Sequence, residues 1–230
     1  MSEIIRKRRS VRKYEPKKPD DNIIMKVREK TETLTPLISG IRYSVEIADK
    51  TRGIFGVAAP CYLVFRSEKK DGYLENVGFL GQQMSLFLSE SGFGSCWLGM
   101  AKPEESGDNA LPFVICIAFG TPAEPLFREL SEFKRKSLSE ISEGSDPRLE
   151  AARLAPSGMN AQNWFFLSKD SVIHCYYKKP NPMLGNRLAR IDIGIALCHI
   201  YEESEVFSFS AEKDAPEKRG YIYAGTVTEG

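Results

Sequence analysis

The chain has 230 residues, 42% of them hydrophobic and 27% charged, with a formal net charge of +1. This composition is typical of a globular protein that buries a sizeable core, and the near-neutral charge argues against a general polyanion binder. The start of the chain has no apolar signal core, and no uncharged run approaches the ~20 residues of a membrane helix. We therefore expect a cytoplasmic protein that binds neither a membrane nor nucleic acid.

The five cysteines are an odd number, widely spaced and without a Cys-x-x-Cys pair. Most lie in apolar runs such as residues 113–119, so we expect small buried hydrophobic side chains in a reducing compartment.

Hydrophobic periodicity predicts the elements of the first half. We expect a helix over residues 21–34, an alternating strand over 41–47 and a buried strand over 61–65. A longer helix follows over 74–91, ended by Gly92, and then a buried strand over 113–119.

The second half repeats this order. Asp146 and Pro147 suit a helix N-cap and first helical position, and predict a short helix that reaches Leu154. Strands over 164–167 and 172–176 follow, separated by a turn at Lys169-Asp170. A helix over 186–201 and a strand over 221–227 complete the chain.

Matching features in the same order indicate a duplication. Residues 34–36 (Leu-Thr-Pro) align with 154–156 (Leu-Ala-Pro), Gly81 with Gly194, and the run 8–11 with 135–138. We predict an α+β fold of two related lobes, residues 1–140 and 141–230, each a mostly antiparallel sheet packed with helices. The lobes would form a single-chain pseudo-dimer that behaves as one cooperative unit.

A basic segment at the start of the chain is the first candidate site. Residues 1–30 hold eleven Lys and Arg against five Asp and Glu. Such an arm can be a solvated face, a nucleic-acid arm or a phosphate clamp. Arg8, Ser10 and Arg12 alternate, so an extended segment would point all three to one side, where guanidinium groups suit a phosphate.

A polar loop in the second half is the second candidate. Pro156, Ser157 and Gly158 form a turn in which glycine lets backbone N–H groups approach a ligand. Asn160 and Gln162 offer both donors and acceptors, or they cap backbone groups within the protein.

Taken together, the run 8–14 and the run 155–164 resemble the two signatures of the nitroreductase family of FMN-dependent oxidoreductases. Residues 90–99, and residues 118–122 with 133–138, are similar to further segments of that family. In the family the two signatures lie close together, whereas here more than half of the chain separates them. Because residues 37–40 lack the polar motif that follows Pro156, we expect one composite site shared by the two halves.

The resemblance implies FMN as the cofactor and assigns its contacts. The residues expected to bind FMN are Arg8, Arg9, Ser10, Arg12, Trp97, Leu98, Gly99, Arg135, Lys136, Pro156, Ser157, Gly158, Asn160 and Gln162. The backbone around Trp97–Gly99 would face flavin N5 and O4, while the Trp97 ring itself is expected in the core. We expect no metal site, because the two histidines, His174 and His199, have no carboxylate or cysteine at metal-ligand spacing. We expect no catalytic side chain, because the flavin would supply the redox chemistry.

The resemblance further implies hydride transfer from NAD(P)H to an oxidised acceptor, such as a nitroaromatic or a quinone, by a ping-pong mechanism. A monomeric pseudo-dimer or a homodimer would both suit such a chain. Two alternatives remain open: a flavin-binding protein without catalysis on the same scaffold, and a nucleic-acid-binding module that uses the basic arm. The acidic remainder of the chain argues against the second.

Overall fold

The computed structural model describes residues 2–53, 56–104, 110–179 and 187–229. One sheet consists of β1 (Tyr43–Ala48), β3 (Cys61–Ser67), β6 (Phe113–Gly120) and β4 (Gly94–Leu98), in that spatial order. Its three pairings are antiparallel. Because β4 is the edge strand, the backbone groups on its outer side are free for partners outside the sheet.

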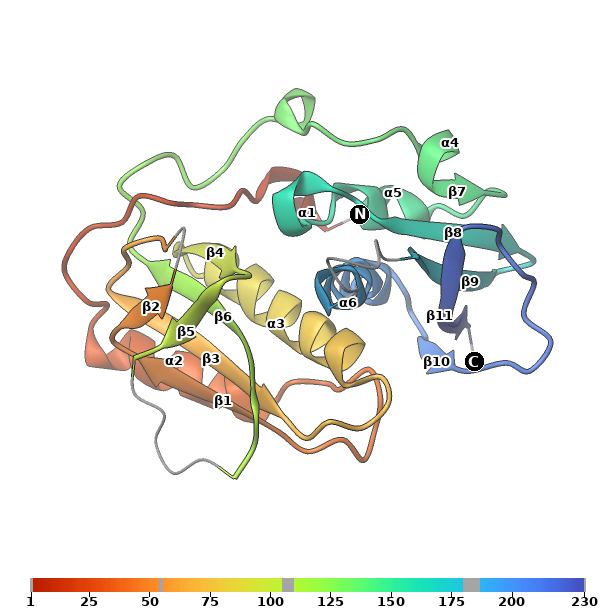
Figure 1. The fold of residues 1–230 in the computed structure, drawn as a ribbon. Helices are drawn as coiled ribbons and strands as arrows, with labels where there is room; N and C mark the ends of the chain where they lie inside the picture. The colour runs from red at the N-terminus through yellow and green to blue at the C-terminus, as the bar shows by residue number, and fades with distance from the viewer. Residues whose placement is uncertain (1, 54–55, 105–109, 180–186, 230) are drawn as a thin grey trace.

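A second sheet is formed by the later part of the chain (Figure 1). Its strands, in spatial order, are β10 (Ser208–Ser210), β11 (Tyr221–Thr228), β9 (Val172–Lys178), β8 (Trp164–Lys169) and β7 (Ser142–Glu143). Only the short β7–β8 pairing is parallel. A two-stranded sheet of β2 (Thr51–Gly53) and β5 (Ala101–Pro103) accompanies the first sheet.

Helices join and cover these sheets. Beyond the two long helices, α3 (Tyr73–Glu90) and α6 (Arg187–Tyr201), the chain forms α2 (Asp21–Glu32) and several short helices. The short ones are α1 (Glu3–Lys7), η1 (Leu130–Glu132), α4 (Leu138–Ile141), α5 (Arg148–Leu154) and η2 (Gly158–Asn160). No helix in the described ranges has the length and apolar character needed to cross a membrane.

The contact between α3 and α6 holds the two sheets together, as Figure 1 shows. Two glycines permit a close approach. A methyl group added to Gly78 would overlap the carbonyl oxygen of Ile191, and one added to Gly194 would overlap the carbonyl oxygen of Glu75. Each glycine therefore meets the residue three positions before the other glycine. Such reciprocity is a property of isologous, two-fold contacts.

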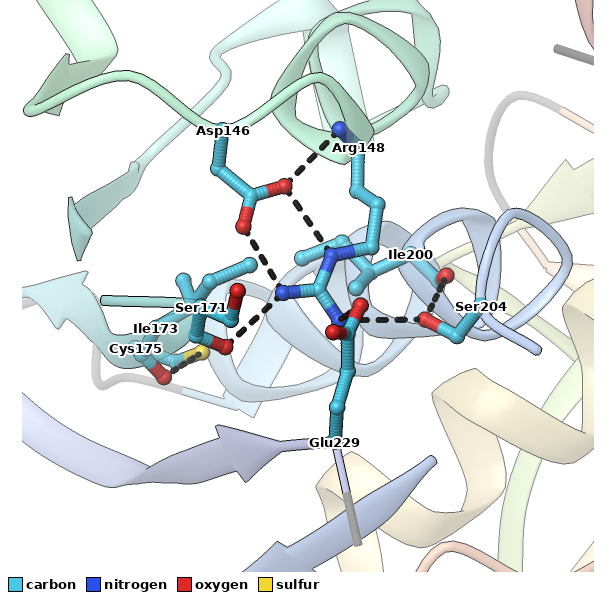
Figure 2. Close-up of polar contacts among 8 residues, drawn as sticks. All are labelled: Asp146, Arg148, Ser171, Ile173, Cys175, Ile200, Ser204 and Glu229. Carbon is cyan, nitrogen blue, oxygen red and sulfur yellow. Dashed lines mark hydrogen bonds and ion pairs between the residues drawn. The ribbon is translucent and has the colours of Figure 1, made fainter. Parts of the chain in front are cut away.

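Second-half elements are also held together by Arg148 at the start of α5, a side chain that is only 4% exposed (Figure 2). Its guanidinium donates two hydrogen bonds to Asp146, at 2.9 and 2.7 Å. It also donates to the Ser171 carbonyl oxygen at 2.9 Å and pairs with Glu229 at 3.1 Å. One buried cation thus links α5, the β8–β9 turn and the end of β11.

The mixed α+β class and the main helices and strands agree with the sequence predictions. The β8–β9 turn is the clearest difference: the left-handed residues are Asp170 (φ 51°) and Ser171 (φ 62°), one position later than predicted. Lys169 instead pairs with Val172, so the hairpin has a two-residue loop. All five cysteines are buried and unpaired, as expected. Asn186, the predicted start of the last helix, lies outside the described residues.

The glycine match also needs correction. Gly194 faces Gly78 and not Gly81, because Gly81 lies against the ring of Trp97. Gly78 and Gly81 are three residues apart on the same helix, so sequence alone offers both as the position equivalent to Gly194; the reciprocal contact favours Gly78.

Candidate functional site

The N-terminal basic segment is docked on the protein. Val11 N–H donates to the Ser95 carbonyl oxygen at 3.0 Å, and Ser10 forms a parallel bridge with Ser95 on β4. Arg8 forms an antiparallel bridge with Phe127. The outer edge of β4 therefore receives this segment, and Arg8 is only 1% exposed rather than part of a solvated face.

Arg8 is a buried cation with unused donors. Its Nε and Nη1 are buried without a hydrogen-bond partner, and only Nη2 contacts Ser10 Oγ, at 3.4 Å. Burial, together with the charges of Arg128 and Arg135, lowers the pKa of Arg8 to about 9. The side chain thus remains charged at neutral pH, and an uncompensated buried charge is costly unless an anion is bound beside it.

Arg128 joins this group, although the sequence analysis did not select it. Its Nε donates to the Arg8 carbonyl oxygen at 3.2 Å, and its guanidinium lies 3.6 Å from the centre of the Phe133 ring. Burial lowers the pKa of Arg128. Arg128 belongs to no sequence motif. It lies close to Arg8 because the connection between the two sheets passes beside the N-terminal segment.

Arg135 connects the cluster to the polar loop. Its Nη1 donates to Asn160 Oδ1 at 2.6 Å and its Nη2 to the Leu154 carbonyl oxygen at 3.2 Å, while its Nε is buried without a partner. Burial, then the charges of Arg128 and Arg153, lowers the pKa of Arg135 to about 10.

Lys136 fixes the other end of that loop. Its backbone N–H donates to Gln162 Oε1 at 2.7 Å, and its Nζ donates to the carbonyl oxygens of Ala161 and Gln162, both at 3.0 Å. Asn160 Nδ2 in turn donates to the Lys134 carbonyl oxygen at 2.7 Å. The structure therefore brings Arg135, Lys136, Asn160 and Gln162 together, with both amides engaged by the protein itself.

The loop that follows Pro156 has an unusual backbone. Met159, Asn160 and Gln162 have φ values of 53°, 56° and 48°, in the left-handed region that disfavours residues other than glycine. The loop is held by Ser157 Oγ, which accepts from Gln162 N–H at 2.9 Å. Strained backbone of this kind is concentrated at ligand sites, and it occurs here beside the arginine cluster.

The remaining basic residues of the first motif diverge. Arg9 pairs with Glu124 at 3.7 Å, and Arg12 is exposed, with its backbone N–H bonded to the same carboxylate. Alternation predicts that Arg8, Ser10 and Arg12 point to one side of an extended segment. In the structure, burial falls from Arg8 to Arg12 as the segment leaves β4.

The Trp97–Gly99 segment combines a core ring with an accessible glycine. Trp97 Nε1 donates to Gln82 Oε1 at 3.2 Å and its ring stacks with Phe65, so the ring is in the core as expected. Leu98 is buried at the end of β4. A methyl group on Gly99 would lie 3.3 Å from Leu188, and one on Gly158 would lie 3.6 Å from the same leucine. Leu188 of α6 therefore lies between these two predicted cofactor segments.

Beneath Leu188, one helical turn along α6, lies Asp192, which the sequence analysis did not select. Asp192 Oδ1 accepts from Gly158 N–H at 3.0 Å, and the side chain is only 5% exposed. Burial raises the pKa of Asp192 to about 7. A single aspartate in a mostly apolar helix that also carries Arg187, Arg190 and His199 forms no motif, and only the predicted role of Gly158 could have pointed to it.

The chemistry available at this site is anion binding at one end and backbone contact at the other. Three arginines converge from two segments, the N-terminal segment and the connection between the sheets, and in the described ranges no carboxylate lies within ion-pair distance of Arg8, Arg128 or Arg135. Such a donor set suits a phosphate dianion. The orphaned Nε and Nη1 of Arg8 and Nε of Arg135 are donors that a phosphate would satisfy.

Comparisons with known proteins identify a family and a similar fold. A family model described as "Putative TM nitroreductase" matches residues 1–204. A Thermotoga maritima structure described as a putative nitroreductase aligns with a TM-score of 0.65 at 22% identity, over 98% of this chain and 90% of its own.

Shorter structures match part of the chain. An FMN-dependent nitroreductase from Clostridium difficile R20291 aligns at 20% identity with a TM-score of 0.46, over 57% of this chain and 93% of its own. No curated protein showed significant similarity. The family match spans most of the sequence and includes both candidate segments, and the chain therefore belongs to the nitroreductase family that this model describes.

Proposed function

We propose that this protein is an FMN-dependent oxidoreductase that passes a hydride from NAD(P)H to an oxidised small-molecule acceptor, such as a nitroaromatic or a quinone. The observation that supports this most strongly is the cluster of Arg8, Arg128 and Arg135, whose buried donors lack an anionic partner among the described residues. Family membership favours the same reading. A flavin supplies the hydride chemistry when bound, and NAD(P)H and acceptor use it in turn in a ping-pong mechanism.

The chain's own residues would bind and orient the cofactor. Arg8, Arg128 and Arg135 would hold the phosphate. Beyond the docked N-terminal segment, the outer edge of β4 near Gly99 would offer backbone groups to the ring, and the Ser157–Gly158 turn would approach it from the other half. Leu188, between the two glycines, would help to exclude water from the reacting face.

The site would be composite and single, which follows from a pseudo-dimeric chain with lobes 1–140 and 141–230. The reciprocal Gly78–Gly194 contact supports this arrangement. A second symmetric pair supports it too: Ile38 N–H donates to Asn76 Oδ1 at 3.1 Å, as Gly158 N–H donates to Asp192 Oδ1 at 3.0 Å. Asn76 lies two residues before Gly78, and Asp192 lies two residues before Gly194.

FMN content and a double variant test the proposal. The purified protein should show flavin absorbance and release about one FMN per chain, identified by mass, and it should oxidise NAD(P)H when an acceptor is present. The double substitution Arg8→Ala and Arg135→Ala should weaken FMN binding at least a hundredfold, because two charge-assisted contacts of roughly 1.5–3 kcal/mol each are lost.

The matched control replaces two exposed arginines, Arg28→Ala and Arg52→Ala, and should leave FMN affinity unchanged. Unaltered affinity in the Arg8/Arg135 variant would refute the phosphate assignment. Two FMN per chain would refute the single composite site. Stoichiometric FMN without turnover on any acceptor would instead favour a flavin-binding protein without catalysis.

A further inference from the structure

Asp192 occupies an unusual position in the proposed site. It is a buried carboxyl group, only 5% exposed, on the helix that contacts α3 between the two sheets. It contacts the turn beginning at Pro156 through Gly158 N–H, and it lies one helical turn from Leu188, which is close to both Gly99 and Gly158. The carboxyl group thus binds one of the two backbone segments that the proposed function places against the flavin ring, and it lies one helical turn from the leucine that is close to the other segment.

The other half of the chain provides an internal comparison. Asn76 occupies the symmetric position on α3 and accepts the symmetric hydrogen bond from Ile38 N–H. An amide is therefore sufficient to make this bond and to hold the loop. In the half that keeps the Pro-Ser-Gly-x-Asn motif, an ionisable acid stands where the other half has a neutral amide. The acid must be explained by its proton or its charge and not by the hydrogen bond alone.

Several charged residues on α6 and on the elements that contact it form ion pairs with one another and not with Asp192. On α6 itself, Arg190 pairs with Glu75 of α3 at 2.6 Å. The other titratable groups on these elements are, on α6, Arg187, Cys198, His199 and Tyr201; on α3, Tyr73 and Glu90; on α5, Arg148, Glu150 and Arg153; on β8, Lys169; and on β9, His174, Cys175, Tyr176, Tyr177 and Lys178. Arg148 pairs with Asp146, and Arg153 pairs with Glu150. In the described part of the chain, no cation is paired with Asp192.

We propose that Asp192 is the proton-binding group of this site: it positions the Ser157–Gly158 turn through Gly158 N–H, and it takes up a proton when the bound cofactor becomes negatively charged on reduction. This inference rests on the proposed function. The electron pair comes from NAD(P)H as hydride, and the proton comes from solvent to the Asp192 carboxylate. Each reduction then adds one proton to the protein, and the acceptor reaction can use it.

The geometry makes the coupling directional. Burial holds the pKa of Asp192 near 7 before reduction, so above that pH the carboxylate is ionised. A second negative charge nearby, in a site of low dielectric, disfavours the ionised form, because like charges raise the pKa of a carboxyl group. Below pH 7 Asp192 already carries its proton, so this carboxyl group takes up no further proton on reduction.

The test is the reduction potential of the FMN-loaded protein as a function of pH, measured from about pH 5.5 to 8.5. Above about pH 7 the potential should fall more steeply with pH than below it. One additional proton per two electrons is a tenfold change in equilibrium constant per pH unit, which corresponds to a slope about 30 mV per pH unit steeper. The Asp192→Asn variant keeps the hydrogen bond from Gly158 N–H and should lose this change of slope.

Asp71→Asn is the matched control, since it removes an exposed carboxylate near Arg190 by the same chemical change. It should retain the wild-type slopes. A wild-type protein with one slope across the whole range would overturn the inference while leaving the proposed function intact, even if Asp192→Asn cannot be purified. A change of slope that survives in Asp192→Asn would overturn it as well. A chain that binds no FMN would overturn the function and this inference together.

Discussion

At the scale of single residues, Asp192 should also be visible in the stability of the protein without cofactor. Its folded pKa, about 7, is above the ordinary value of 3.8 because the carboxyl group is buried. The folded state then binds the proton more tightly than the unfolded state. The stability contributed by that proton is complete below about pH 4 and is lost as pH rises through about 7.

We therefore expect wild-type stability to decline relative to Asp192→Asn between pH 4 and 7. The relative loss should approach about 4 kcal/mol, the upper limit that the two pKa values allow. Urea unfolding at a series of pH values measures it. Asp71→Asn, with its exposed carboxyl group, should follow the wild-type curve, and parallel curves for wild type and Asp192→Asn would contradict the assignment.

The site residues that sequence reasoning proposed differ in a physical way from those that only the structure suggests. Arg8, Arg135 and Ser157 lie in short motifs whose spacing carries information. Arg128 and Asp192 carry none, because their importance arises from where tertiary structure places them. Arg12 is the opposite case, because it lies in the motif but not in the arginine cluster. The backbone has left β4 at that point, and the side chain is exposed.

At the scale of elements, the Arg148 cluster should dominate the stability of the second half (Figure 2). Replacement by leucine leaves the buried carboxylate of Asp146 without its partner, and we expect a loss of about 3–5 kcal/mol. Arg153→Ala is the control. Its pair with Glu150 spans one helical turn and is partly exposed, so the loss should stay below about 1 kcal/mol. Equal losses in urea unfolding would contradict the role of burial.

Elements with a strong periodicity could be predicted, and short ones could not. The helices α2 and α3 and the strands β3, β6 and β9 each present enough consecutive residues for a pattern of apolar positions to emerge. The strands β2, β5, β7 and β10 have two or three residues, and their existence depends on the partner strand. The turn was predicted one residue too early, at Lys169-Asp170. By composition alone, Lys-Asp and Asp-Ser are both compatible with a turn, so the sequence does not distinguish the two positions.

At the scale of the whole molecule, the α3–α6 contact should depend on both glycines. In an isolated helix, Gly→Ala stabilises by up to about 1 kcal/mol. At Gly78 or Gly194 the added methyl group would instead overlap a backbone carbonyl of the opposing helix, and we expect a loss of about 1–3 kcal/mol.

Because the two glycines are in contact, the double variant should cost less than the sum of the single ones. Thermal or urea unfolding of the three variants tests this, with Asn22→Ala on the exposed face of α2 as the control for helix propensity. Stabilisation by either glycine substitution would show that the helices are farther apart than described here.

The mixed α+β class and the order of long elements were predictable from sequence, whereas the helix crossing was not. Gly78 and Gly81 both lie in α3, and the pattern of the chain does not distinguish the one that faces Gly194 from the one that faces Trp97. That choice depends on the rotation of the helix about its own axis, which is decided by the packing of the two sheets.

The three converging arginines have a consequence for how the protein matures. Arg8 lies in the N-terminal segment that docks on β4, while Arg128 and Arg135 belong to the connection that leads into the second sheet. Without an anion the three arginines repel one another, and this repulsion disfavours the contact between the N-terminal segment and the connection. A phosphate among them turns that repulsion into attraction, so occupancy and closure of the N-terminal segment form a single equilibrium. Cofactor supply during synthesis would then govern how much of the newly made chain escapes proteolysis.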